Sequence, residues 1–277
     1  MVIPTRNRHD LLERAIKSVE AQELPVHEII VVDEASEPPV DKKAGATTII
    51  RHSSPRGPGA ARNVGAEHAT GDIIAFLDDD DMWLPAKTAL VSRAFEEITD
   101  AGAVFHAVAF KPPRDPTQPS LKILDEPVKR MLLARPPHPS GLAVTADLMS
   151  RVRFDEQIPG AADLDFNIRI AEMSLVVEIE EVLALHGSRP MGGSDVSIDR
   201  RIEGRLFMRQ RHSKYFEDPE VSRHHEYRLG HLYRRSGQKS KALSSFSRLL
   251  LSNPFDARPW KGIAVTAVPP LSRITDR

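Results

Sequence analysis

The sequence contains no cysteine, and this absence removes several kinds of site. Without thiols there is no disulfide, no cysteine-ligated zinc site and no thiol nucleophile. No apolar run approaches the ~20 residues of a membrane span, and the first residues show no signal-peptide pattern. Lysine and arginine total 38 against 39 aspartates and glutamates, so no overall charge attracts nucleic acid or membranes. We therefore expect a cytoplasmic protein with no transmembrane segment and no bound nucleic acid, leaving open a peripheral contact with the inner face of a membrane.

Short apolar runs alternate with amphipathic segments over residues 1–110. Strands are expected over residues 2–3, 28–32, 47–51, 73–77 and 103–110, and helices over residues 9–22, 57–69 and 85–99. Strands that alternate with helices form parallel sheets with right-handed crossovers. The predicted fold class is therefore α/β.

A proline-rich segment and a less regular section follow. Residues 111–120 contain four prolines, which exclude regular structure and predict a long loop or lid. The section that continues to residue 195 includes an expected strand at 142–144 and an expected helix at 163–173. We treat residues 111–195 as the second part of the chain.

The third part, residues 196–277, is predicted to be helical. Its small and apolar residues have the spacing of a single tetratricopeptide-like helix pair, at Leu229, Gly230, Tyr233, Gly237, Ala242, Phe246 and Pro254. One such repeat cannot stand alone. We therefore expect a hairpin that docks on the rest of the chain, or alternatively a surface for a protein partner or a second copy.

The most distinctive stretch is a run of four carboxylates, Asp78 to Asp81, directly after the apolar run Ile73–Leu77. In an open α/β sheet, ligands bind at the carboxyl ends of the strands. Adjacent like charges repel, and a divalent cation with oxygen ligands is the simplest way to neutralise them. The alternative is a solvated acidic turn that caps the helix beginning near Pro85, and Asp81 is the carboxylate considered for that cap.

Several ordered motifs together carry a resemblance to a known family. They are Ile3-Pro4-Thr5-x-Asn7-Arg8, Ile30–Asp33, Gly59-Ala60-Ala61-Arg62-Asn63-x-Gly65, Phe76–Asp81, Phe154–Glu156 and Gly160–Asp165. This combination resembles the family 2 glycosyltransferases of the GT-A fold over roughly the first ~200 residues. Several motifs in order are far more specific than an isolated Asp-x-Asp.

The resemblance implies a Rossmann-like, mostly parallel sheet flanked by helices, with the C-terminal helical extension added to it. Residues 1–110 would bind the nucleotide sugar, residues 111–195 the acceptor, and residues 196–277 would form the extension. The implied reaction is an inverting, metal-dependent transfer from a nucleotide-diphosphate donor, a UDP-sugar, to an acceptor hydroxyl. The cation would be Mn²⁺ or Mg²⁺, and the acceptor a saccharide, a lipid-linked sugar, a peptide or a small molecule.

The resemblance also assigns roles to the carboxylates. Asp80 would bind the metal, which stabilises charge on the leaving diphosphate. Asp78 and Asp79 would hold the ribose or a metal-bound water, and Asp33 would accept a hydrogen bond from the base. Asp163 would be the general base that takes the proton of the acceptor hydroxyl.

The other donor-binding residues predicted by the resemblance are Pro4, Thr5, Arg6, Arg8 and Arg62. Arg62 lies near the start of a glycine-opened helix, where an anion is favoured, so it could reach a phosphate. Arg6 stands where a base-stacking tyrosine is common, and a guanidinium can also stack on a flat ring.

Alternatives remain for several of these residues. Asp163 could be a helix N-cap, with Asp165 as the fallback base. His138 and His186 could approach the diphosphate or the metal. Arg189 lies in a glycine-rich segment that resembles the part closing over the donor.

Two other functions compete with sugar transfer. A non-catalytic interaction protein built on a transferase-like domain would have lost its carboxylates, whereas here they are intact. A nucleotidyltransferase would need a glycine-rich phosphate loop after the first strand, and residues 4–8 contain no glycine. A dehydrogenase is disfavoured because no Gly-x-Gly-x-x-Gly follows that strand.

Overall fold

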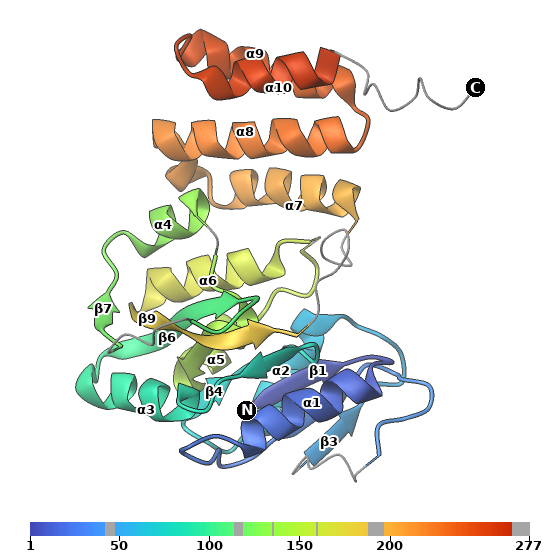
Figure 1. Ribbon diagram of the computed structural model, residues 1–277, viewed down its shortest axis with the longest axis vertical. Coiled ribbons are helices and arrows are strands. Elements are labelled where there is room, and N and C mark those ends of the chain that lie inside the picture. Colours follow the sequence, from blue (N-terminus) through green and yellow to red (C-terminus); the bar gives the residue numbers. More distant parts are fainter. Residues whose placement is uncertain (42–47, 114–118, 135, 159, 188–196, 268–277) are drawn as a thin grey trace. The chain divides into compact units, whose positions relative to one another are not determined.

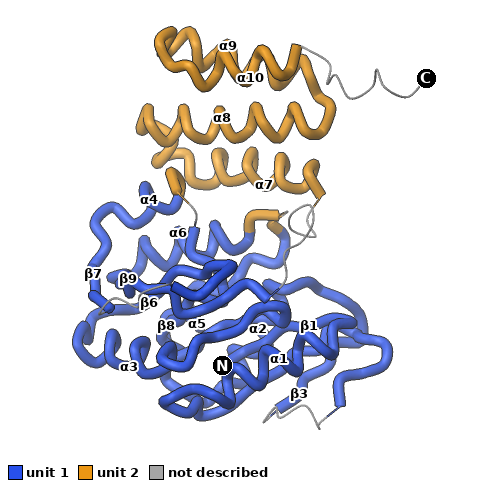
Figure 2. Tube along the Cα trace, viewed as in Figure 1, with its two compact units in different colours: residues 1–131, 135–157, 162–193 blue, residues 132–134, 158–161, 194–277 orange. Residues whose placement is uncertain are grey.

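The computed structural model in Figure 1 describes residues 1–41, 48–113, 119–134, 136–158, 160–187 and 197–267. The chain forms two compact units, shown in different colours in Figure 2. Unit 1 comprises residues 1–131, 135–157 and 162–193, and unit 2 comprises residues 132–134, 158–161 and 194–277. The predicted division into a donor half, an acceptor half and an extension stays a prediction.

A three-stranded parallel sheet begins unit 1. Its strands, in spatial order, are β1 (Val2–Thr5), β2 (Ile30–Asp33) and β3 (Thr48–Arg51). The helices that connect them in sequence and follow them are α1 (His9–Glu20) and α2 (Pro58–His68). Strands β1 and β2 are buried throughout, as expected for parallel strands covered by helices. Helix α1 buries the apolar face predicted for it, Leu12, Ala15, Ile16 and Val19.

A six-stranded mixed sheet forms the other half of unit 1. Its strand order is β4 (Ile73–Ala75), β8 (Leu142–Thr145), β6 (Ala101–Ala109), β9 (Leu175–His186) and β5 (Asp81–Trp83), with β7 (Leu121–Ile123) also paired to β9. Strands β6 and β9 are parallel, and the other pairs are antiparallel. The remaining helices of this region are α3 (Lys87–Glu97), α4 (Pro127–Leu133), α5 (Ala146–Val152) and α6 (Ala162–Met173). A 3₁₀ turn, η2, spans Pro139–Gly141.

The two sheets meet at the end of β4, where a parallel bridge joins Phe76 to Val2. Phe76 lies edge-on to Phe154, and Phe154 stacks on Phe166 with ring centroids 3.8 Å apart. All three rings are buried, so they fix the strand end against α6 and the segment after α5. The acidic run therefore starts from a rigid part of the core.

The predicted α/β class with a helical extension is confirmed, while several strands and helices differ from the expected elements. The strand expected over 73–77 ends as a regular strand at Ala75. Strand β9 was not predicted, because the glutamates at 178, 180 and 181 interrupt the apolar pattern of Leu175–His186.

Unit 2 consists mainly of helices, α7 (Ile198–Arg211), α8 (Pro219–Arg235), α9 (Lys239–Ser252) and α10 (Ala257–Ala267), with a 3₁₀ turn, η3, at Ser213–Glu217. Their core centres on Phe246, against which Gly230 and Gly262 pack so closely that a Cβ atom would lie 2.8 and 2.7 Å from the ring. Among the described residues, no helix has the length and apolar character needed to cross a bilayer. The resemblance to a tetratricopeptide pair stays a prediction.

Candidate active site

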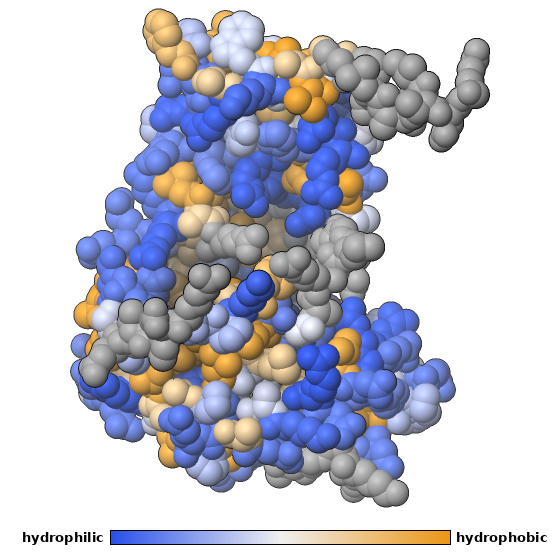
Figure 3. All heavy atoms as spheres, in the orientation of Figure 1, coloured by the Kyte–Doolittle hydropathy of each residue, from blue (hydrophilic) through white to orange (hydrophobic). Residues whose placement is uncertain are grey.

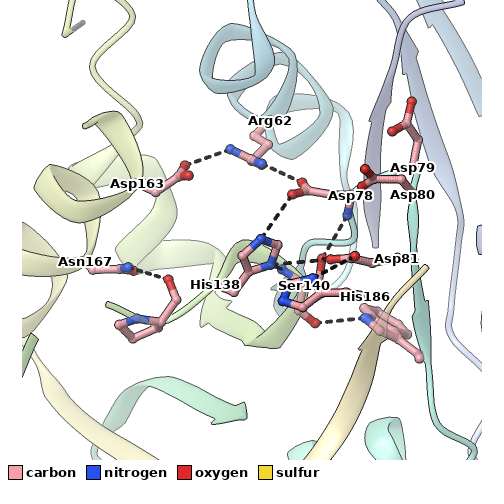
Figure 4. A network of polar contacts seen from close by, with 12 residues as sticks. Arg62, Asp78, Asp79, Asp80, Asp81, His138, Ser140, Asp163, Asn167 and His186 are labelled. Carbon is pink, nitrogen blue, oxygen red and sulfur yellow. Dashed lines mark hydrogen bonds and ion pairs between the residues drawn. The ribbon is translucent and has the colours of Figure 1, made fainter. Parts of the chain in front are cut away.

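The four consecutive carboxylates occupy the turn that leads from β4 into β5. The N–H of Leu77 donates to the carbonyl of Val2, and the N–H of Asp81 donates back to the carbonyl of Asp78. The N–H of Asp78 also donates to the hydroxyl of Ser140, at 3.1 Å. In Figure 4 the side chain of Asp78 points toward Arg62, whereas that of Asp81 points toward Ser140.

Asp78 belongs to a bridge formed by one buried arginine. Arg62, whose side chain is only 3% exposed, donates from Nη2 to Asp78 at 2.6 Å and from Nη1 to Asp163 at 2.9 Å (Figure 4). Burial by itself would raise the pKa of Asp78, but Arg62 and, to a smaller extent, His138 hold that pKa below its ordinary value. The phosphate contact predicted for Arg62 stays a prediction. In this structure both terminal nitrogens of its guanidinium contact carboxylates.

Asp163 lies in the first turn of α6, which begins at Ala162, and therefore not at the N-cap position. Its side chain is 47% exposed, so a bound molecule could reach its free oxygen. Asp165, the fallback base, is fully buried and pairs with Arg169 at 2.7 Å. The geometry therefore gives the accessible carboxylate to Asp163 and a structural ion pair to Asp165.

Residues of the first loop contact the next two carboxylates. The hydroxyl of Thr5 donates to Asp79 at 2.8 Å, and Arg8 Nη1 lies 3.2 Å from Asp79 and 3.5 Å from Asp80. Burial raises the pKa of Asp79, while the bonds from Thr5 and Arg8 oppose that rise. Pro4 is buried within β1, whereas Arg6 is exposed. Thus Thr5 and Arg8 are brought to the acidic turn, and Arg6 has no contact there.

Asp81 has a different position from the helix cap considered for it. It lies in β5, is buried, and accepts a 2.6 Å hydrogen bond from the hydroxyl of Ser140. His186 Nδ1 is 3.1 Å and His138 Nδ1 is 3.5 Å from its carboxylate. Burial raises the pKa of Asp81, and the charge of Asp78 adds to this rise against the bond from Ser140. Antiparallel pairing of β5 with β9 explains the contact with His186, which is the register partner of Asp81.

Asp81, His138 and His186 form a set of possible metal ligands. One atom from each lies within 4.8 Å of the others, in the part of the chain that the structure describes. The rings of His138 and His186 meet edge to face, with centroids 4.9 Å apart. His138 Nε2 is also 3.7 Å from Asp78, so this cluster adjoins the bridge through Arg62.

Ser140 is a central residue that the sequence alone did not reveal. Besides its bonds to Asp81 and Asp78, its carbonyl accepts a 3.0 Å hydrogen bond from the indole of Trp83. Its position depends on the 3₁₀ turn η2, which has proline in its first turn. The sequence shows only a serine after His138 and Pro139, and no local pattern connects this serine to Asp81, 59 residues away.

Asp33 is buried in a loop network at the end of β2. Its carboxylate accepts the N–H of Ser36 at 2.8 Å, the N–H of Val40 at 3.2 Å and the guanidinium of Arg51 at 2.5 Å. Burial alone would raise the pKa of Asp33, but these bonds lower it. The predicted contact with a base stays a prediction, and in this structure the half-buried Arg51 lies on the carboxylate instead.

Comparison with known proteins places this chain in a family. Residues 1–154 match the family described as Glycosyl transferase family 2. An uncharacterised glycosyltransferase of a Nostoc strain is 26% identical over 290 residues, which cover 92% of this chain and 88% of that protein. Several other curated relatives match over 96 to 109 residues, so the chain spans only about a third of their length.

Two solved structures share the fold. Residues 1–349 of Staphylococcus aureus TarS, in complex with UDP-GlcNAc, have a TM-score of 0.62 and 16% identity, covering 90% of this chain and 79% of that one. The mannosyltransferase PcManGT of Pyrobaculum calidifontis, in complex with GDP-Man and Mn²⁺, has a TM-score of 0.61 and 20% identity, covering 97% and 80%. At these identities the likeness concerns the fold alone.

Proposed function

The chain belongs to glycosyl transferase family 2, and from this premise we propose that it transfers a sugar from a nucleotide-diphosphate donor, a UDP-sugar, to an acceptor hydroxyl with inversion. Inverting transfer needs a site for a charged leaving group and a base on the opposite side of the sugar. The observation that carries the proposal is the bridge in which Arg62 holds Asp78 and Asp163. The bridge places an exposed carboxylate beside the acidic turn.

In the proposed mechanism Asp163 is the general base. As the acceptor hydroxyl attacks the anomeric carbon, Asp163 would take its proton and the nucleotide diphosphate would leave. Arg62 would keep the carboxylate oriented, because the guanidinium is itself buried and cannot swing away. The exposed oxygen of Asp163 is the one left for the acceptor.

A divalent cation completes the proposal. Asp80 is the predicted ligand, and its side chain, 29% exposed, is more accessible than that of Asp79. The set formed by Asp81, His138 and His186 offers one oxygen and two nitrogen ligands. Carboxylate oxygens suit both Mg²⁺ and Mn²⁺, so Asp80 and Asp81 could bind either cation. When bound, the cation would stabilise the negative charge of the diphosphate.

The two solved structures of similar fold support a nucleotide-diphosphate sugar as the donor. Both structures hold a nucleotide-diphosphate sugar, and the PcManGT complex also contains Mn²⁺. The alternative of a non-catalytic interaction protein is disfavoured by the organised carboxylates, each of which has defined partners. We therefore expect hydrolysis of a nucleotide sugar even without the acceptor.

The test is a screen of nucleotide sugars with Mn²⁺ or with excess chelator, measuring released nucleotide. One sugar donor should be hydrolysed only with the metal, and Asp80→Ala should abolish this activity without unfolding the protein. Asp10→Ala, which removes an exposed carboxylate from α1, is the matched control and should behave as wild type. Equal affinity for the nucleoside diphosphate with Mn²⁺ and with chelator, measured by calorimetry, would contradict the metal-dependent site.

A further inference from the structure

Unit 2 carries a charge that the overall balance of the chain conceals. Residues 198–267 contain fifteen lysines and arginines but seven aspartates and glutamates, a net charge of +8 in a chain whose total is −1. A surface with this excess attracts anions over about a Debye length, ~10 Å at moderate salt. The helical unit is therefore electrostatically distinct from the acidic remainder of the sequence.

Some carboxylates of the same unit pair with these cations. Glu226 pairs with both Arg209 and Arg248, and Asp256 pairs with Arg258. Arg205 has no ion pair among the described residues. Burial and the charges of Arg228 and Arg201 lower its pKa to about 10. Repulsion between Arg205 and these neighbouring arginines is relieved when an anion binds near them.

Large apolar side chains protrude from the same unit. Phe255 is 97% exposed and Leu251 86%, and both lie at or near the turn between α9 and α10. Trp260, in the first half of α10, is 57% exposed and donates from its indole to the carbonyl of Pro254 at 3.2 Å. Apolar atoms are visible beside hydrophilic ones over α9 and α10, at the top of the view in Figure 3.

Basic residues lie next to this protruding turn in the sequence. Arg248 precedes it, and Arg258 and Lys261 follow it. Arg223, Asp256 and Arg258 line the same pocket, so a further cation lies near the turn. We name the group formed by Leu251, Phe255, Trp260 and Lys261 the α9–α10 tip.

We propose that the α9–α10 tip is a membrane-contacting surface, which inserts its apolar side chains among the headgroups of a bilayer rich in anionic phospholipid. Interfacial binding combines these two features, buried apolar area and attraction of Lys and Arg to anionic lipid. Tryptophan and phenylalanine suit the boundary between headgroups and acyl chains. A soluble polyanion would use the positive charge but would gain nothing from fully exposed Phe255 and Leu251.

The experiment is sedimentation of the full chain with vesicles. Wild type should bind vesicles with about one third phosphatidylglycerol, bind pure phosphatidylcholine much more weakly, and be released by salt. The double variant Leu251→Ser/Phe255→Ser should lose about tenfold or more in affinity. Lys261→Gln should lose about fivefold, the effect of one basic residue near the surface. These side chains are exposed, so melting temperature and donor hydrolysis should not change.

The matched control is Leu24→Ser/Met173→Ser, which removes two half-exposed apolar side chains from unit 1. It should bind anionic vesicles as wild type does. Failure of wild type to bind anionic vesicles, or equal binding by the tip variant, would overturn the proposal. Tight binding of inorganic polyphosphate that abolishes vesicle binding, with no effect of the tip variant on either, would instead identify a soluble polyanion. Donor hydrolysis is measured separately, so none of these outcomes depends on the proposed activity.

Discussion

Replacing Arg62 by methionine should destabilise unit 1 strongly, because it removes the cation that bridges Asp78 and Asp163. Breaking a buried ion pair by deleting one partner costs ~3–5 kcal/mol, whereas an exposed pair contributes ~1 kcal/mol or less. Asp163 is 47% exposed and adds little, while Asp78, 25% exposed, supplies most of the loss. We expect a loss of about 3 kcal/mol, or a fall of roughly 6–12 °C in melting temperature for this chain length.

The effect should also depend on pH in a defined direction. In wild type, Arg62 keeps the pKa of Asp78 low, so the stabilisation is present at neutral pH and is lost only as pH falls through that pKa. In Arg62→Met, burial raises the pKa of Asp78 without the opposing effect of Arg62. Protonation of Asp78 then removes the uncompensated negative charge. The difference in melting temperature between the two proteins should therefore narrow from neutral pH towards about pH 4.

The assay is thermal unfolding of both proteins in chelator, at neutral and acidic pH. Arg93→Met is the matched control, because Arg93 forms an exposed i,i+4 pair with Glu97 on α3 and should matter by about 0.5 kcal/mol or less. Arg62→Lys should lie between them, since an ammonium keeps the charge but cannot bridge both carboxylates with a planar fork. Equal melting temperatures for Arg62→Met and Arg93→Met, with no narrowing at low pH, would refute the reasoning.

Three further predictions concern other buried groups. Burial lowers the pKa of Lys87 from 10.5 to about 7, so between these pH values the unfolded chain binds more protons than the folded chain. The free energy of unfolding should therefore rise with pH in this range, by up to about 1.4 kcal/mol per pH unit. Thermal melts of Lys87→Met should lack this pH dependence. Glu34→Gln should lower the free energy of unfolding by about 1–3 kcal/mol, because Glu34 accepts hydrogen bonds from two backbone N–H groups before α2 and contacts buried His52. Amide hydrogen exchange at residues 52–57 should become faster, and unchanged exchange there would contradict this prediction. Gly230→Ala should destabilise unit 2 by about 1–3 kcal/mol through overlap with Phe246, while an unchanged unfolding profile would show that the ring can move aside.

Much of the local structure of this site could be predicted from sequence. The apolar run before Asp78 and the periodic residues of α1 and α6 are short-range signals, and each element formed close to its expected place. The acidic turn consequently lies where a strand end was expected. The resemblance of the ordered motifs to a known family then indicated which other loops would lie near the acidic turn.

The partners of the charged groups could not be predicted in the same way. Arg62 contacts residues 16 and 101 positions away, and Ser140 contacts Asp81 across 59 positions. Such contacts depend on sheet pairing and on a 3₁₀ turn, which leave no periodic trace in the sequence. Local reasoning therefore could not show that Arg62 contacts Asp78 and Asp163, and the helix cap considered for Asp81 is wrong because Asp81 lies in β5.

The most direct test of the central claim is the transfer rate of Asp163→Asn, measured with a sugar donor and its acceptor. Asparagine can still accept the hydrogen bond from Arg62 but cannot take a proton, so melting temperature and donor affinity should stay near those of wild type. The transfer rate should fall roughly 10²–10⁴-fold, the usual contribution of a general base. Asp165→Asn, the matched control, should lower stability through its pair with Arg169 more than it lowers the rate. A nearly wild-type rate in Asp163→Asn would contradict the account and move the base to another group.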